Sequence, residues 1–400
     1  MLVGGLGSDA PLEQYWFNST NGALSATASL SAGTGTSWLT LSADSLFVYA
    51  AGSAAVTTVG VSWPAGASVG GLASQPTLSV VSTTALPPGA GSATHMALAA
   101  GALFTVSYGR GSGTGLGVSP TNGSLWVSAP PVNLCNNPHQ LVIAPTGIKN
   151  GAQSWTAVVP CLGDDSVLLL SIGSMCSGPL GSLCNGGVAS SRPGSGPRHA
   201  VLHPRLPVAY VLNELDSSIG VWNIDVSGQS MLGAVYTSSL PSGTPFAGNA
   251  SAWGAGEVAL NADGSVLYVS NRPLLPGVAS TIGAFALSAA TGAITSAIGW
   301  NDGDGLLNFP RHFSLTPDGR FLLAASQKGG NIVVMSVQPD GSLTTVGAFE
   351  TVGSSPSWVG VLPWPVLRPA SAARSLAWVN ALVMAAAAVL VAGAWWGGVV

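Results

Sequence analysis

Apolar and polar positions alternate over short stretches of this chain, and one arrangement of them returns along almost its whole length. Each copy begins with polar residues, continues as an alternating apolar segment, turns at Pro or Asp-Gly residues, and ends in a second apolar run. A period of two is typical of half-buried β-strands, and the turn residues predict that the two runs form a hairpin. Seven copies start near residues 36, 93, 137, 197, 255, 310 and 355.

The spacing of these copies predicts a repeat fold. The interval runs from 44 residues (93 to 137) to 60 residues (137 to 197), which suits one four-stranded propeller blade with insertions. The last copy has room for one strand, and the chain opens on the unpartnered apolar stretch MLVGGL. We therefore predict an all-β, seven-bladed β-propeller over residues 1–366. Its last blade is closed by the N-terminal strands, because closure removes open sheet edges.

Composition agrees with this fold and excludes one class of partner. The 54 Gly and 27 Pro residues favour short strands and many turns. Only 6% of residues are charged, and the formal net charge of −4 leaves no general basic surface. We therefore expect no nucleic-acid partner.

The C-terminal residues 376–400 are strongly apolar and carry no charge. They are long enough to cross a bilayer, and tryptophans lie near both ends. We predict a C-terminal apolar helix after a linker at 367–375, acting as a membrane anchor or as a cleaved lipid-anchor signal. A buried helix packed on the domain is the alternative. Because no secretory signal precedes the first strand, a cytoplasmic location is expected, attached to a membrane if the tail is an anchor. The secretory pathway with a lipid anchor is the alternative if the N-terminus is incomplete.

Four cysteines, Cys135, Cys161, Cys176 and Cys184, match no metal-ligand spacing, and no Cys-x-x-Cys occurs. We therefore expect no metal and no cofactor. Free thiols are expected in the cytosol, whereas Cys176 and Cys184 could pair in a secreted chain.

The repeat register places a set of polar residues at one rim of the fold. Because the two strands of each hairpin are antiparallel, the start of the first and the end of the second lie together. The first position is occupied by Thr94-His95, His139-Gln140, Arg198-His199, Gly256-Glu257 and Arg311-His312, with Trp38 and Trp358 in the other two copies. The second is occupied by Tyr108, Cys161, Glu214, Arg272 and Gln327. If the first strands line a central channel, these groups converge on one mouth and predict an anion-binding and acid/base site. For any single copy, a solvated or hydrogen-bonded structural role is the alternative.

Three segments, at 197–225, 256–272 and 308–343, resemble the seven-bladed propeller lactonase family. This family includes the bacterial cycloisomerase-2-like 6-phosphogluconolactonases and the fungal carboxy-muconate lactonizing enzymes, and the resemblance is strongest from about 137 to 361. It implies a lactone hydrolase that opens a sugar lactone or phospholactone. The alternatives are a carboxy-cis,cis-muconate cycloisomerase and a non-catalytic propeller scaffold at a membrane.

The resemblance also assigns roles to individual residues. Catalytic roles fall on His139, Arg198, Glu214 and Arg272. Substrate-binding roles fall on His199, Arg311, His312 and Gln327. In the hydrolase, Glu214 or His139 would activate water, Arg198 or Arg272 would stabilise the oxyanion, and the remaining arginine with Arg311 would hold a phosphate or carboxylate.

One position departs from the family pattern. The stretch VVPCLGDDSV carries Cys161 where the family has an aspartate, which removes any substrate contact made through that carboxylate. The expected partner is a small-molecule lactone, carboxylate or phosphate, and the propeller is expected to be monomeric.

Overall fold

The computed structural model describes residues 1–362 apart from 8–9, 34–35, 65–74, 150–151, 174–175, 177, 226–229, 246 and 354. The predicted linker at 367–375 and the predicted apolar helix at 376–400 lie outside these residues and stay predictions. Within the described ranges, no helix has the length and apolar character needed to cross a membrane.

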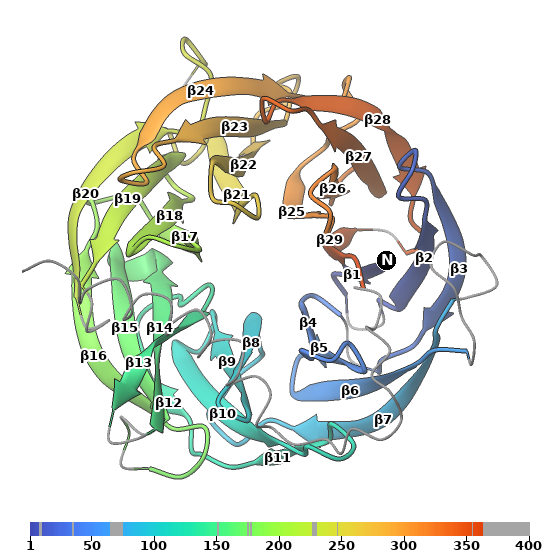
Figure 1. Cartoon of the computed structure of the whole chain (residues 1–400), viewed down its shortest axis with the longest axis vertical. Coiled ribbons are helices and arrows are strands. Elements are labelled where there is room, and N and C mark those ends of the chain that lie inside the picture. Colours follow the sequence, from blue (N-terminus) through green and yellow to red (C-terminus); the bar gives the residue numbers. More distant parts are fainter. Residues whose placement is uncertain are drawn as a thin grey trace, which may run out of the picture. The chain divides into compact units, whose positions relative to one another are not determined.

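The described chain folds into seven antiparallel sheets arranged as blades around a central axis (Figure 1). Each of the seven predicted copies supplies the first strand of one sheet, which confirms the all-β seven-bladed propeller. These first strands are β4 (Leu39–Leu41), β8 (His95–Ala99), β13 (Val142–Lys149), β17 (Pro197–Leu202), β21 (Trp253–Leu260), β25 (Pro310–Leu315) and β29 (Pro356–Gly360).

The remaining strands follow in the same order outward from the axis. The second strands are β5 (Phe47–Ala51), β9 (Ala102–Ser107), β14 (Ala152–Cys161), β18 (Val208–Asn213), β22 (Val266–Pro273), β26 (Phe321–Ser326) and β1 (Leu2–Gly5). The third strands are β6 (Ala55–Ser62), β10 (Ser112–Val118), β15 (Ser166–Gly173), β19 (Ser218–Ile224), β23 (Thr281–Leu287), β27 (Asn331–Val337) and β2 (Leu12–Phe17). The outer strands are β7 (Thr77–Ala85), β11 (Leu125–Val127) with β12 (Val132–Asn133), β16 (Leu183–Ser190), β20 (Met231–Ser238), β24 (Ile294–Asn301), β28 (Leu343–Glu350) and β3 (Leu24–Leu30). A 3₁₀-helix, η2 (Leu162–Asp164), follows β14.

The N-terminal strands complete the last blade, as predicted. β29 pairs with β1, with Leu2 opposite Gly360 and Val3 opposite Val359, and the sheet continues in the order β29-β1-β2-β3. The pairing joins segments from opposite ends of the described chain and closes the ring.

A repeated hydrogen bond ties two of the blades to the blade that follows each of them. The buried Tyr210 of β18 donates its hydroxyl hydrogen bond to the carbonyl of Gly292, in the β23–β24 turn of the following blade, at 2.6 Å. Tyr268 of β22 repeats this contact with the Gly341 carbonyl of the β27–β28 turn at 2.9 Å. Both glycines adopt positive φ, which a side chain would strain. The same contact at equivalent places sets the spacing of neighbouring blades.

A buried carboxylate ties the closing blade to its neighbour. Glu13 of β2 is 4% exposed and accepts hydrogen bonds from the backbone N–H groups of Val352 at 3.0 Å and Gly353 at 2.6 Å, and from the hydroxyl of Tyr15. Val352 and Gly353 follow β28, so this one side chain links the closing blade to the segment that leaves the blade before it.

Replacing Glu13 should destabilise the ring. We expect Glu13→Ala to lower the free energy of unfolding by about 2–4 kcal/mol, because two backbone N–H groups and one hydroxyl lose a charged partner. Urea unfolding measures the change. The control is Glu350→Ala, at an exposed end of β28, which should change stability by less than about 0.5 kcal/mol. Equal effects of the two substitutions would contradict the proposed link.

Candidate active site

The two Pro-Arg-His stretches are the same β-bulge in two blades. In β17 the pairing register shifts between Pro197 and His199 and leaves Arg198 as an extra residue. The equivalent shift in β25 leaves Arg311 as the extra residue. A bulge bends the strand and redirects the side chain of its extra residue. The bulges thus explain why the side chains of Arg198 and Arg311 point into a cavity, which both of them line.

A cavity of about 430 Å³ lies among the starts of the first strands and the ends of the second strands. Its lining includes six of the eight predicted site residues, namely His139, Arg198, His199, Glu214, Arg311 and His312. Arg272 and Gln327 are not among the lining residues. The predicted convergence of different blades on one site is therefore present, with those two residues outside the cavity wall.

Two arginines share the Glu214 carboxylate. Arg198 Nη1 donates to Oε2 at 2.9 Å, and Arg272 Nη2 donates to Oε1 at 2.8 Å. Burial by itself raises the pKa of Glu214, but the charges of Arg198 and Arg272 outweigh this effect and lower the pKa to about 2. Glu214 is therefore ionised at neutral pH.

Arg272 lies behind Glu214 and is 2% exposed. Its Nε donates to the carbonyl of Gly254 at 3.1 Å, and its Nη2 also donates to the carbonyl of Ala255 at 2.6 Å. The guanidinium therefore orients Glu214 and does not face the cavity. Its catalytic role stays a prediction, and the contacts describe a positioning residue.

Gln327 has a limited role in this geometry. Its backbone N–H donates to the carbonyl of Phe309, and its buried side-chain oxygen has no hydrogen-bond partner among the described residues. Its predicted contact with substrate stays a prediction.

His139 lies beside Arg198 at the cavity. Arg198 Nη1 contacts His139 Nε2, and Arg198 Nε donates to the carbonyl of Gly256 at 2.8 Å. The other ring nitrogen of His139 lies 3.2 Å from Nε2 of His199. Burial, followed by the charge of Arg198, holds the pKa of His139 well below its usual value, so the imidazole is neutral at pH 7.

Arg311 differs from the other two site arginines because it has no partner. Within the described part of the chain its guanidinium makes no hydrogen bond and no ion pair, although it lines the cavity. Burial and the nearby charge of Arg198 lower its pKa to about 10, which leaves it charged at neutral pH. A partly buried guanidinium facing a cavity is suited to binding a phosphate or carboxylate.

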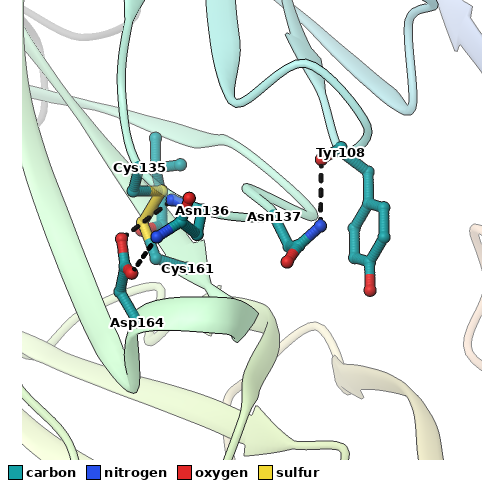
Figure 2. Close-up of a disulfide and its surroundings, with 7 residues drawn as sticks. Tyr108, Cys135, Asn136, Asn137, Cys161 and Asp164 are labelled. Carbon is teal, nitrogen blue, oxygen red and sulfur yellow. Dashed lines mark hydrogen bonds between the residues drawn. A yellow bond between two sulfur atoms is a disulfide. The ribbon is translucent and has the colours of Figure 1, made fainter.

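Figure 2 shows a disulfide in the segment that leads to His139. Cys135 is bonded to Cys161 at the end of β14, with 6.0 Å between their Cα atoms. The adjacent Asn137 donates from its side chain to the carbonyl of Tyr108 at 3.2 Å, and the ring of Tyr108 lies 5.4 Å from that of His139. The disulfide thus fixes the approach of this segment to the cavity.

Both disulfides bear on expectations from the sequence. Cys176 is bonded to Cys184, the pair that the sequence allows in a secreted chain, and none of the four cysteines has the free thiol expected in the cytosol. No spacing pattern signalled the bond between Cys135 and Cys161, which are 26 residues apart. Cys161 is fully buried and does not line the cavity, so it offers no substitute for the aspartate of the family pattern.

Four further residues lie at or beside the cavity although the sequence does not single them out as site residues. Trp38, Thr94 and Tyr108 line the cavity, and each occupies a rim position that the repeat alignment had identified. Glu257 occupies another such position and is buried beside His199. The repeat register was therefore a sufficient signal for all four.

The fold and the site together are those of a β-propeller enzyme. Its charged cavity lies among the inner strands and has a size that suits a small molecule. A family model described as "Lactonase, 7-bladed beta-propeller" matches residues 1–361, and the chain belongs to this family.

The relatives at moderate identity include two 6-phosphogluconolactonases. The chain is 31% identical over 262 residues to a 6-phosphogluconolactonase of Yersinia pestis (strain Pestoides F), covering 65% of this chain and 70% of the relative. It is 30% identical over 296 residues to the 6-phosphogluconolactonase of Yersinia enterocolitica, covering 73% and 80%. The structure of a periplasmic gluconolactonase from Pseudomonas aeruginosa is 24% identical with a TM-score of 0.70, covering 89% of this chain and 96% of that one. This last likeness supports the fold.

The disulfide between Cys135 and Cys161 should contribute more stability than the second one. Closing a loop of 26 residues is worth about 3.5 kcal/mol in the chain-entropy treatment, against about 2.5 kcal/mol for the 8-residue loop of Cys176 and Cys184. We expect the double substitution Cys135→Ser/Cys161→Ser to lower the unfolding free energy more than the control Cys176→Ser/Cys184→Ser. Denaturant unfolding compares the two, and the reverse order would contradict the assignment.

Stability should fall on acidification because four histidines are buried in the neutral form. Burial lowers the pKa of His95, His139 and His199 well below 6.5, and that of His312 to about 4. The unfolded chain binds these protons near pH 6.5, so it holds more protons than the native state and stability is lost as pH falls below that value. Glu257, whose pKa is raised by burial, acts in the opposite direction above pH 4.5.

Removing one of these histidines should reduce this slope. For His312→Gln we expect the unfolding free energy to fall less steeply between pH 6 and pH 5, with a slope that is smaller by about 1.2 kcal/mol per pH unit, because slightly less than one extra proton binds to the unfolded histidine there. Urea unfolding across this range measures the slope in both proteins. An unchanged slope would show that His312 is not held neutral.

Proposed function

We propose that this protein hydrolyses a sugar lactone and prefers one that carries a phosphate, such as 6-phosphogluconolactone. The observation that carries the proposal is the unpaired Arg311 guanidinium in the same cavity as the Arg198, His139 and Glu214 cluster. Ester hydrolysis requires an activated water and a cationic site for the developing oxyanion, and a phosphate substituent requires a second cation. The two Yersinia relatives are 6-phosphogluconolactonases, which supports this substrate class.

The electrostatics favour His139 over Glu214 as the base. A carboxylate with a pKa of about 2 is a weak base at neutral pH, and both of its oxygens already accept from arginines. The neutral imidazole of His139 has one lone pair, on the Nε2 that contacts Arg198, and this lone pair can take a water proton once Arg198 turns to the developing oxyanion. Glu214 then serves to hold Arg198 at the cavity wall, and Arg198 is the donor to the oxyanion.

These residues account for every proton that moves during the hydrolysis. The water oxygen bonds to the lactone carbonyl carbon while its proton passes to His139, and Arg198 stabilises the oxyanion. The intermediate then breaks its ring C–O bond, and the leaving alkoxide takes the proton back from His139. The product is an open-chain hydroxy acid, with its phosphate held by Arg311.

The location of the protein is part of the same proposal. Two disulfides are typical of an oxidising compartment, which favours the secretory alternative over the cytosol. Attachment to a membrane would require residues 376–400, which lie outside the described part of the chain.

Arg311 should determine the preference for a phosphorylated substrate. The full chain should hydrolyse 6-phosphogluconolactone faster than the spontaneous background. In Arg311→Met we expect KM for this lactone to rise about tenfold or more, because a charge-assisted contact is lost, while KM for unphosphorylated gluconolactone changes less than about twofold. Steady-state hydrolysis of both lactones measures the difference.

The matched control is a substitution of an arginine outside the cavity. Arg320→Met removes an exposed arginine paired with Asp318, away from the cavity, and should change neither KM. Equal loss on both lactones would contradict the role of Arg311. Turnover of a carboxy-muconate in place of the lactones would indicate a cycloisomerase, and inactivity on all of them would indicate a binding scaffold.

A further inference from the structure

Glu257 is a buried acid that the proposed chemistry has not used. It belongs to a third bulge, in β21, where the register shifts between Ala255 and Val258. The residue before it is Gly256, and a Cβ atom there would lie 2.7 Å from the carbonyl oxygen of Pro310. This bulge therefore has no side chain where the other two bulges have arginines. Glu257 itself is 4% exposed and does not line the cavity.

A continuous chain of contacts joins Glu257 to the cavity. Arg198 Nη1 contacts His139 Nε2, and His139 Nδ1 lies 3.2 Å from His199 Nε2. His199 Nδ1 lies 2.9 Å from Glu257 Oε1, which also accepts from the backbone N–H of Val258 at 3.0 Å. All of these side chains are nearly fully buried.

The chemistry of the donors fixes the direction of this chain. A guanidinium can only donate, so His139 Nε2 must accept from Arg198. The neutral His139 ring then carries its proton on Nδ1 and donates to His199 Nε2. By the same reasoning His199 carries its proton on Nδ1 and donates to Glu257, so the chain ends on an oxygen that accepts.

The second oxygen of Glu257 also faces an N–H group. His312 Nδ1 accepts from the backbone N–H of Val359 at 3.3 Å, which places the ring proton on Nε2. This Nε2 lies 3.6 Å from Glu257 Oε2, which makes no hydrogen bond among the described residues. A carboxylate can present acceptors to both histidines, whereas an amide would present a donor to one of them.

We propose that Glu257 is a positioning residue that sets the tautomers of His199 and His139 and stabilises the imidazolium formed when His139 takes a proton. This inference rests on the proposed function for its catalytic part. The other charged groups near the histidine pair are Arg198, Arg272, Arg311 and Glu214. Three arginines and only one carboxylate, Glu214, surround His139 and His199, so a positive charge on either histidine is unfavourable. The carboxylate of Glu257 reduces this cost.

The test is Glu257→Gln in the full chain, with 6-phosphogluconolactone as substrate. We expect kcat to fall about tenfold or more with KM within about twofold, because the base is affected and the anion site is not. His312 and His95 also lie near the pair, and they are unchanged in this variant. Losing a negative charge lowers the pKa of the pair, so the acid limb of kcat/KM should move to lower pH. Glu257→Asp keeps the charge and should restore the acid limb.

A matched control is Glu13→Gln, since Glu13 is also 4% exposed and is not part of the cavity. It should leave kcat and the acid limb unchanged. A purely structural role for Glu257 predicts that both glutamine variants lose stability alike and that neither moves the acid limb, and that result would overturn the proposal.

The tautomers can be measured without activity. In ¹⁵N-histidine NMR spectra of the wild-type protein, we expect His139 and His199 both to carry their proton on Nδ1, and at least one of them to change in Glu257→Gln. Finding the proton on Nε2 of His199 in the wild type would overturn the proposal even if the variant fails to fold. Expected tautomers in a protein that hydrolyses no lactone would support the hydrogen-bond chain and reject the proposed function.

Discussion

Antiparallel pairing between β1 and β29 joins the ends of the propeller, and the cavity depends on this closure. The groups at the cavity and directly behind it come from different blades: His139 precedes β13, Arg198 lies in β17 and Arg311 in β25, and Glu257 of β21 lies behind them. No single blade holds two members of the hydrogen-bond chain that leads from His139 through His199 to Glu257. The distances along this hydrogen-bond chain are therefore set by how neighbouring blades pack, and the blades have fixed positions because the ring is closed.

The distribution of charge follows from the low dielectric at the axis. Burying a charge is costly unless it is paired, and the chain is poor in charged residues. Glu214 meets this requirement twice, through Arg198 and Arg272, and the result is a cluster with one excess positive charge. Arg311 adds another cation without a partner in the described structure. The cavity therefore has an excess of positive charge, which an anionic substrate would neutralise.

The sequence predicted the blades and the rim positions because both depend on local periodicity. A period of two with turn residues defines each hairpin, and each hairpin brings a first-strand start beside a second-strand end. Contacts between blades have no such local signal. The bond of Cys135 to Cys161, the place of Arg272 behind Glu214 and the contact of His199 with Glu257 all depend on packing between segments far apart in the chain. The bulges were also hidden, because each lies near the start of its strand, where too few residues precede it for a break in the alternation to show.

Those bulges explain how one repeated structural unit supplies different chemical groups. In β17 the extra residue Arg198 meets Glu214 at the end of its hairpin partner and is held as an ion pair. In β25 the extra residue Arg311 belongs to a hairpin that ends in the neutral Gln327, and it remains unpaired. In β21 the neighbouring blade approaches so closely that glycine takes the first bulge position, and the following Glu257 points to His199. The same β-bulge occurs in all three strands. Whether it places a paired cation, an unpaired cation or a buried acid depends on the residue across the hairpin or in the next blade.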